Sequence, residues 1–184
     1  MAAVPHDVIG FWTAAGPAKW FAKNDAFDAA IRLKFEPVHH AAARGRYDRW
    51  EDTPDGALAL LILLDQFPRN LWRDSAHAFA TDPLARAIAR RAEAAGHDKA
   101  TEPLLRPFFY LPFEHSELLA DQEESLALCR ALPVVEGGPE NLKFAEIHHD
   151  IIKRFGRFPH RNRALGRVTT PAEQEFLDEG GFAG

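Results

Sequence analysis

The chain has 184 residues, of which 46% are hydrophobic and 27% charged. This composition excludes wholesale disorder, and the length is sufficient for one well-buried core. The net charge of −5 argues against a nucleic-acid partner bound through bulk electrostatics, because such binding requires a basic surface.

Cysteine usage and hydropathy indicate the compartment. Cys129 is the single cysteine, so the chain can form neither an intrachain disulfide nor a multi-cysteine zinc site, which fits a reducing environment. Residues 1–7 lack the basic and apolar regions of a secretory signal. The longest apolar run, 57–64, is far shorter than the roughly 20 residues that a membrane span needs. We therefore expect a soluble, cytoplasmic protein with no membrane partner.

Apolar residues recur at helical spacing from the start of the chain, and strand-like alternation is nearly absent. The predicted fold class is therefore all-α. A first helix is expected over residues 4–12, and Asn24-Asp25 can cap a second helix. The inward face of that second helix is expected to comprise Phe27, Ile31, Leu33 and Phe35.

A central helix is predicted to begin at Thr53-Pro54-Asp55, which combines a capping hydroxyl, a proline in the first turn and an acid that favours the helix dipole. Residues 57–64 are apolar all round, so this helix should be covered on several sides. Phe67-Pro68 is predicted to end it, because proline lacks an N–H and its ring clashes with the preceding turn.

Further helices are predicted in the second half of the chain. Asp82-Pro83 should open a helix that ends near Gly96, and residues 114–132 are typical of a long helix with an acidic outer face. Another helix is expected over 140–155, ended by Gly156, and Thr170-Pro171 should begin a short terminal helix. Short turns between seven or eight helices favour antiparallel helical hairpins, as a bundle or a stacked array, in one α-helical domain over residues 1–184.

One phrase occurs twice: an apolar stretch leads into Phe-Pro and then an arginine and an asparagine, at 62–70 and again at 151–162. The two phrases could face one site, or they could be two similar structural corners. Within the first phrase, Asp65 follows a long apolar run near the expected helix end, where a negative charge needs a partner. Arg69 or an arginine of the second phrase could supply it. Asp65 is then either a structural clamp or a site residue.

Residues 153–167 contain six basic side chains and no acid, which is a marked local bias in an acidic chain. Residues 114–124 hold the complementary acids. The two segments could pair across a helix contact, or the arginines could form an anion site, because a guanidinium binds carboxylate or phosphate with two parallel hydrogen bonds.

The nine histidines match no metal-binding pattern. His148 lies on the apolar stripe of its helix, which is typical of a satisfied core histidine, and His115 and Gln122 are expected two turns apart on one face. A metal site of His115, Glu117 and His148 is the weaker alternative. No glycine-rich phosphate loop is present. We expect neither a metal nor a cofactor.

Three stretches resemble signature motifs of the bacterial domain-of-unknown-function family 924: LILLDQFPRNLWR at 61–73, LPFEHSELLADQ at 111–122 and HHDIIKRFGRFPHRNRALGR at 148–167. The resemblance extends over nearly the whole chain. It implies an α-helical fold similar to the tetratricopeptide-like superfamily, and it implies no reaction. Fold analogy favours a binding role, although a fold does not determine function.

The three stretches also supply a candidate site rich in donors for an anionic ligand. The leading hypothesis is a pocket for a small anionic molecule, bearing phosphate or carboxylate, with His115 or His148 as a catalytic acid–base residue. The alternative is a noncatalytic helical module that takes a peptide or protein segment. The candidate ligand-binding residues are Asp65, Gln66, Arg69, Asn70, Glu117, Gln122, Arg157, His160, Arg161 and Asn162.

Overall fold

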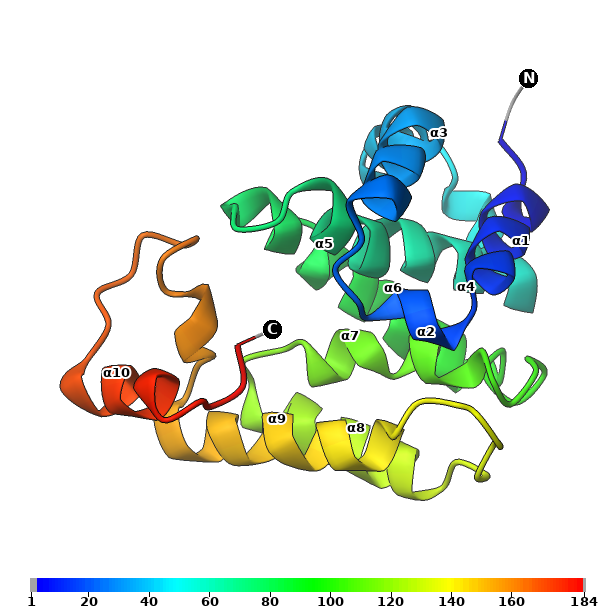
Figure 1. Cartoon of the computed structure of the whole chain (residues 1–184). Helices are drawn as coiled ribbons and strands as arrows, with labels where there is room; N and C mark the ends of the chain where they lie inside the picture. The colour runs from blue at the N-terminus through cyan, green and yellow to red at the C-terminus, as the bar shows by residue number, and fades with distance from the viewer. Residues whose placement is uncertain (1–2, 184) are drawn as a thin grey trace.

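The computed structural model describes residues 3–183, and within them the chain forms helices and no strand, which confirms the all-α prediction (Figure 1). Short 3₁₀ helices connect several of the α-helices, for example Asp48–Asp52 before α4 and Pro159–Arg161 after α9. The α-helices are α1 (Pro5–Ala15), α2 (Pro17–Trp20), α3 (Asp25–Ala43), α4 (Pro54–Leu61), α5 (Phe67–Leu71), α6 (Asp82–Ala94), α7 (Leu111–Glu114), α8 (Leu119–Arg130), α9 (Asn141–Phe155) and α10 (Pro171–Asp178).

The predicted helix starts are confirmed by their caps. The side chain of Asn24 accepts a hydrogen bond from the N–H of Phe27, and Thr53 accepts one from Gly56 at the start of α4. Thr170 and Glu173 form a reciprocal capping box at α10. Gly156 ends α9 in the left-handed conformation, with φ of 70°.

The helix that begins at Pro54 lies at the centre of the molecule, as predicted. Every residue from Gly56 to Pro68 is buried. Helices α1 and α6 pack against α4, and α3 packs against α5, so this helix is covered on several sides (Figure 1). The main apolar core forms around it, with Trp12 and Phe67 fully buried.

Pro68 does not end this helix, contrary to the sequence prediction. A π-helical turn, Ile62–Gln66, joins α4 to α5, and the N–H of Phe67 bonds the carbonyl of Ile62 five residues earlier. The wider turn accommodates the proline ring and its missing N–H, and helical structure continues to Leu71.

The π-helical turn leaves carbonyl groups that side chains from other elements satisfy. The carbonyl of Leu64, which lies four residues before the proline, accepts a hydrogen bond from the Thr81 hydroxyl at 2.5 Å. The carbonyl of Leu63 accepts one from Nδ1 of His39 at 2.8 Å. These bonds explain how a proline is tolerated inside a buried helix.

Two further predictions were wrong in detail. The helix expected over 114–132 is broken at 115–118, between α7 and α8. The break follows from local bonds: the Ser116 hydroxyl accepts from the N–H of Leu118 and donates to Asp121. Leu33 is 84% exposed instead of facing inward, because it lies two residues from Ile31 and therefore on the opposite side of α3.

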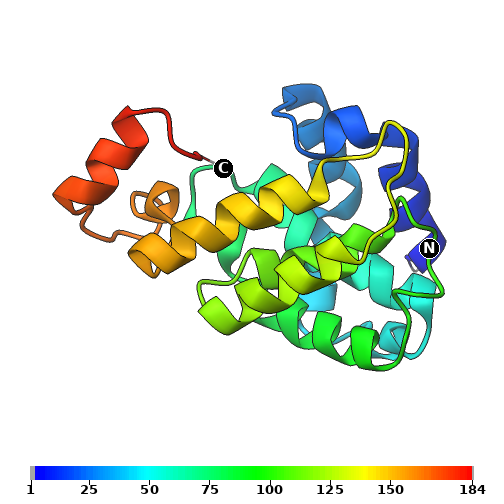
Figure 2. The same ribbon diagram turned by 90° about the horizontal axis from the view of Figure 1, so that it is seen from below.

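Helices α8 and α9 form an antiparallel hairpin joined by the loop 131–140, and α10 lies beyond the far end of α9 (Figures 1 and 2). A second, smaller apolar core forms there from Ile151, Ile152 and Phe158, with Phe176 and Phe182 packed against it. The tetratricopeptide-like detail and the single domain stay predictions. Across residues 3–183, no helix combines the length and the apolar character that crossing a membrane requires.

Candidate functional site

Charged and polar side chains are buried between the two apolar cores. On one side, Asp65 follows directly after Leu64 of the main core, and on the other His148 contacts Phe158 of the smaller core with a ring-centroid distance of 5.3 Å. Such side chains are costly to bury for packing alone. We define the polar cluster as the buried Asp65, Asp82, Glu114, His148 and Arg161 together with the half-buried Arg69, His115 and His160.

The centre of the polar cluster is a pair formed by Asp65 and His115. Nδ1 of His115 donates to the two carboxylate oxygens of Asp65, at 2.8 and 3.0 Å. The amide of Gln66 donates to Oδ2 of the same carboxylate at 2.5 Å. Burial alone would raise the pKa of Asp65, but His115, the nearby charge of Arg69 and these hydrogen bonds outweigh it and hold the pKa at about 2. Asp65 is therefore ionised in the folded protein.

Burial, together with the charge of Arg69, lowers the pKa of His115, so its imidazole is neutral near pH 7. Because Asp65 holds the proton on Nδ1, Nε2 carries the free lone pair. Among the hydrogen bonds of residues 3–183, none involves this nitrogen. The side chain is 13% exposed, so Nε2 is the ring atom that a ligand or water can use.

Arg69 confirms the expectation that an arginine of a Phe-Pro phrase meets Asp65. Its Nη1 lies 3.4 Å from Oδ1 of Asp65. The same guanidinium binds Asp82 with two parallel hydrogen bonds of 3.1 Å. Arg69 is thus held by two carboxylates, and its side chain remains 23% exposed.

Arg161 is more deeply buried and less completely bonded. Its guanidinium lies between the rings of Phe79 and Phe158, at 4.6 and 4.4 Å from their centroids. Nη1 donates to the carbonyl of His115 at 3.0 Å and lies 3.6 Å from Asp82, whereas the buried Nε has no hydrogen-bond partner in the described part of the chain. Burial, and then the charge of Arg69, lowers the pKa of Arg161 to about 10.

Glu114 and His148 form a second carboxyl–imidazole pair. Nδ1 of His148 donates to the carbonyl of Phe144 at 2.7 Å and lies 3.2 Å from Oε1 of Glu114. Burial and the charge of Asp65 raise the pKa of Glu114 to about 8, and burial lowers the pKa of His148 to about 3. Both groups are therefore uncharged near neutral pH.

Of the sequence-predicted site residues, the structure brings Asp65, Arg69, His115, His148, His160 and Arg161 together, with Gln66 at their edge. The others are bound elsewhere. Asn70 donates to Asp28 at 2.8 Å, and Arg157 forms two hydrogen bonds to Glu173, at 2.6 and 2.8 Å.

Three more predicted residues form ion pairs or hydrogen bonds that hold the fold together. Glu117 accepts from Arg167 at 2.8 and 3.0 Å and from the N–H of Phe158. Asn162 bonds Glu173, and the amide of Gln122 donates to the carbonyls of Glu114 and Ser116, so it holds the end of α7. His115 and Gln122 do not share a helix face as expected, because the chain leaves the helix between them.

The three residues of the alternative metal site, His115, Glu117 and His148, do not come together. Glu117 is bound to Arg167 and not to the two histidines. In residues 3–183, no three His, Cys, Asp or Glu side chains are arranged to hold a metal ion.

Sequence reasoning missed Asp82 and Glu114 of the polar cluster and the rings of Phe79 and Phe158 that contact Arg161. The Asp82-Pro83 pair indicates only a helix start, which the structure confirms, and the sequence pattern predicts Glu114 on an outer acidic face. A weak signal for Glu114 exists in hindsight: it directly follows the apolar run 107–113, as Asp65 follows 57–64.

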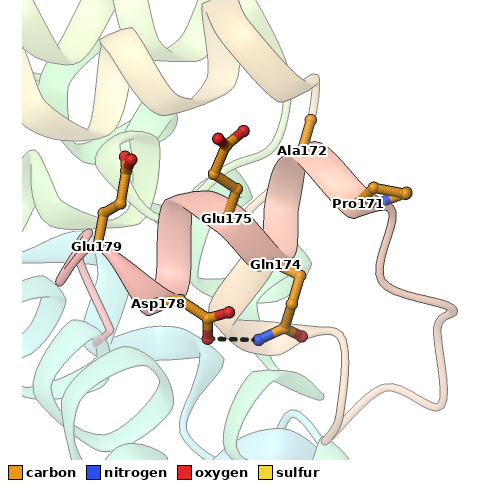
Figure 3. A pocket seen from close by; sticks show the side chains of 6 residues that line it. All are labelled: Pro171, Ala172, Gln174, Glu175, Asp178 and Glu179. Atoms are coloured by element: carbon orange, nitrogen blue, oxygen red, sulfur yellow. Dashed lines mark hydrogen bonds between the residues drawn. The ribbon is translucent and has the colours of Figure 1, made fainter.

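Two surface hollows lie outside the polar cluster. Each is lined by a single helix, so neither gathers residues from different elements. Figure 3 shows the one on α10, where Asp178 accepts a hydrogen bond from Gln174 at 2.8 Å and the carboxylates of Glu175 and Glu179 reach outward. The other runs along α6, past Arg86 and Arg90.

Comparison with known proteins gives a family but no activity. The family model described as "Bacterial protein of unknown function (DUF924)" matches residues 8–181. A solved structure, that of the protein of unknown function ATU0120 from Agrobacterium tumefaciens, is 49% identical, with a TM-score of 0.90 over 96% of this chain and 97% of that one. A search of functionally curated proteins finds no match. The chain belongs to the DUF924 family of bacterial proteins.

Proposed function

We propose that the polar cluster binds a small anionic molecule and that His115 acts on this molecule as a general acid–base residue. One observation carries the proposal: a buried guanidinium, that of Arg161, has an unpaired Nε–H and lies against the residue whose imidazole Nε2 is free. A guanidinium with an unpaired N–H thus contacts the backbone of the residue that carries the free imidazole nitrogen.

An anion explains the incomplete bonding of Arg161. A buried guanidinium is costly unless its N–H groups are paired, and the carboxylate nearest to Arg161, that of Asp82, already accepts from Nη1 and Nη2 of Arg69. A carboxylate or phosphate oxygen would complete its hydrogen bonds, as the planar fork of arginine favours. The exposed part of Arg69 and His115 marks the side from which the molecule would enter.

The Asp65–His115 pair supports acid–base chemistry. An ionised, buried carboxylate on Nδ1 fixes the tautomer and orientation of an imidazole, which leaves Nε2 as the base. Neighbouring nucleophiles do not fit a covalent mechanism. The hydroxyl of Ser116 donates to Asp121 at 2.6 Å, and burial raises the pKa of Cys129 to about 12. His115 would therefore act directly on the bound molecule or on water.

The proposal is tested by a thermal-shift screen of the full chain with phosphate, citrate, 2-oxoglutarate and nucleotides. At a hundredfold excess over the dissociation constant, a bound anion adds about 2.7 kcal/mol to the stability, which raises the midpoint by roughly 5–10 °C. Arg161→Lys keeps the charge but loses the planar fork of the guanidinium. The affinity for the anion should therefore fall at least tenfold, and the midpoint shift should shrink with it. Arg91→Lys is the matched control, because Arg91 forms a similar two-bond pair with Glu51 on the exposed surface of α6.

A noncatalytic peptide-binding module is the second candidate, and the internal ion pairs of Arg69, Arg157 and Arg167 favour it. If no anion shifts the midpoint of the wild type or of Arg91→Lys, the anion site is excluded. The peptide-binding module is then the better hypothesis.

A further inference from the structure

The segment that follows α10 returns to the polar cluster. It runs from the end of α10 back towards the middle of the molecule (Figure 1). Its Phe182 ring packs edge-to-face on His148, with a centroid distance of 4.5 Å, and on His160, at 5.4 Å. A single aromatic side chain therefore covers two of the three histidines of the cluster.

Two glycines direct this return. Gly180 has φ of +82°, a conformation that favours glycine, and its N–H bonds the carbonyl of Leu177 at 3.2 Å. The N–H of Gly181 bonds the carbonyl of Phe176 at 2.9 Å, and a Cβ at Gly181 would lie 2.5 Å from that residue. The turn thus requires glycine at both positions.

Beyond this turn the segment is held by one side chain. Among residues 3–183, no hydrogen bond or ion pair joins residues 182 and 183 to the rest of the chain. The ring of Phe182 packs on the smaller core and on the histidines. Detaching the segment from the cluster therefore requires the removal of one ring and no loss of backbone bonds.

The covered region has unused hydrogen-bonding capacity. Nδ1 of His160 and Nε of Arg161 are adjacent in the chain, both buried, and neither has a partner in the described structure. A packing segment that only stabilised the fold would be expected to cover apolar surface, where no polar atom is left unpaired. Here the ring of Phe182 packs on His160, whose unpaired Nδ1 a bound molecule could satisfy.

We propose that residues Gly180–Ala183 form a cover over the polar cluster, hinged at Gly180-Gly181 and anchored by Phe182, which opens to admit the ligand and closes to exclude water. This proposal rests on the proposed function for the identity of what enters. A cover of this kind strengthens electrostatic interactions in the closed site and sets the rates of entry and release.

The test measures histidine accessibility in the full chain by carbethoxylation with diethyl pyrocarbonate, followed by peptide mass mapping. In Phe182→Ala, modification of His148 and His160 should accelerate roughly three- to tenfold, the factor that corresponds to losing one half-buried phenylalanine ring. Exposed His6 and buried His39, which lies under Trp72, serve as internal references and should keep their rates. Phe182→Leu, which keeps apolar bulk, should stay close to the wild type.

Phe21→Ala is the matched control, because Phe21 is an exposed ring that packs on Phe108 of the main core. It should leave His148 and His160 unchanged. Equal rates in Phe182→Ala and wild type would overturn the cover. The measurement needs no ligand, so a failed anion screen would count against the proposed function and not against the cover. With an anion from that screen, Phe182→Ala should release it at least threefold faster.

Discussion

Nδ1 of His115 donates to the carboxylate of Asp65 at 2.8 Å, although the two residues lie 50 positions apart in the chain. The contact joins the π-helical turn of the central helix to the break between α7 and α8. Both elements are departures from regular α-helix, and π-helical turns occur frequently at functional sites. The irregular backbone thus places a buried carboxylate directly against an imidazole.

Replacing Asp65 should destabilise the protein strongly. Asp65→Ala removes the partner of His115 and one of two carboxylates bound to Arg69, so we expect a loss of about 3–5 kcal/mol in the free energy of unfolding. Urea denaturation measures this loss. Asp150→Ala is the control, since its side chain is 80% exposed, and it should change the stability by less than about 0.5 kcal/mol. A similar small value for Asp65→Ala would contradict the buried pairing.

The central position of α4 predicts a large cost for Leu61→Ala. Leu61 is fully buried, and large-to-small core substitutions cost about 2–5 kcal/mol. Leu33→Ala on the exposed side of α3 is a matched control and should cost less than about 0.5 kcal/mol. Equal effects of the two substitutions in chemical denaturation would place α4 on the surface and refute the architecture.

The Thr81 hydroxyl is predicted to stabilise the π-helical turn. Thr81→Val keeps the size of the side chain but leaves the Leu64 carbonyl without its donor, which should cost about 1–3 kcal/mol. Thr13→Val, at an exposed position of α1, should be nearly neutral. If the two variants unfold at the same urea concentration, the carbonyl does not depend on Thr81.

Glu114 should make the protein less stable as the pH rises. Its pKa is about 8 in the folded chain and 4.5 as a free side chain, so between these values the folded state holds a proton that the unfolded state lacks. Stability then falls by up to about 1.4 kcal/mol per pH unit. His148 and His160 act in the opposite direction below pH 6.5, because burial lowers the pKa of each to about 3.

Between pH 6.5 and 8, the pH dependence of the stability therefore reports on Glu114. In Glu114→Gln, which mimics the protonated carboxyl, the fall of stability across this window should disappear. Denaturation midpoints of the two proteins at several pH values measure the difference. Parallel curves for Glu114→Gln and wild type would show that the carboxyl is ionised in the folded protein.

The helix starts were predictable because they depend on local chemistry. Thr53 and Thr170 are followed by proline, and the caps form within four residues. Pro68 shows where local rules fail. Its effect depends on Thr81, a donor 17 positions from the carbonyl it bonds, and no local pattern reveals that the helix can continue.

The polar cluster was predictable in part, because some of its features also depend on local sequence. The apolar run before Asp65 indicates that its charge is buried, and electrostatics then predicts an arginine partner. Electrostatics does not determine which arginine pairs with which acid. Arg167 pairs with Glu117, as the complementary segments suggested, but Arg157 pairs with Glu173 and Asp121 pairs with arginines of α6. Those pairings depend on tertiary geometry that charge patterns do not encode.

The most direct measurement is the ¹⁵N NMR spectrum of histidine-labelled protein at pH 7, with and without an anion that raises the unfolding midpoint. The structure predicts a neutral His115 with its proton on Nδ1 and a free Nε2, and the Nε2 resonance should shift when the anion binds. In Asp65→Asn the preference for the Nδ1 proton should be lost. A His115 protonated on Nε2, or an Nε2 resonance that stays fixed while the anion binds, would contradict the site.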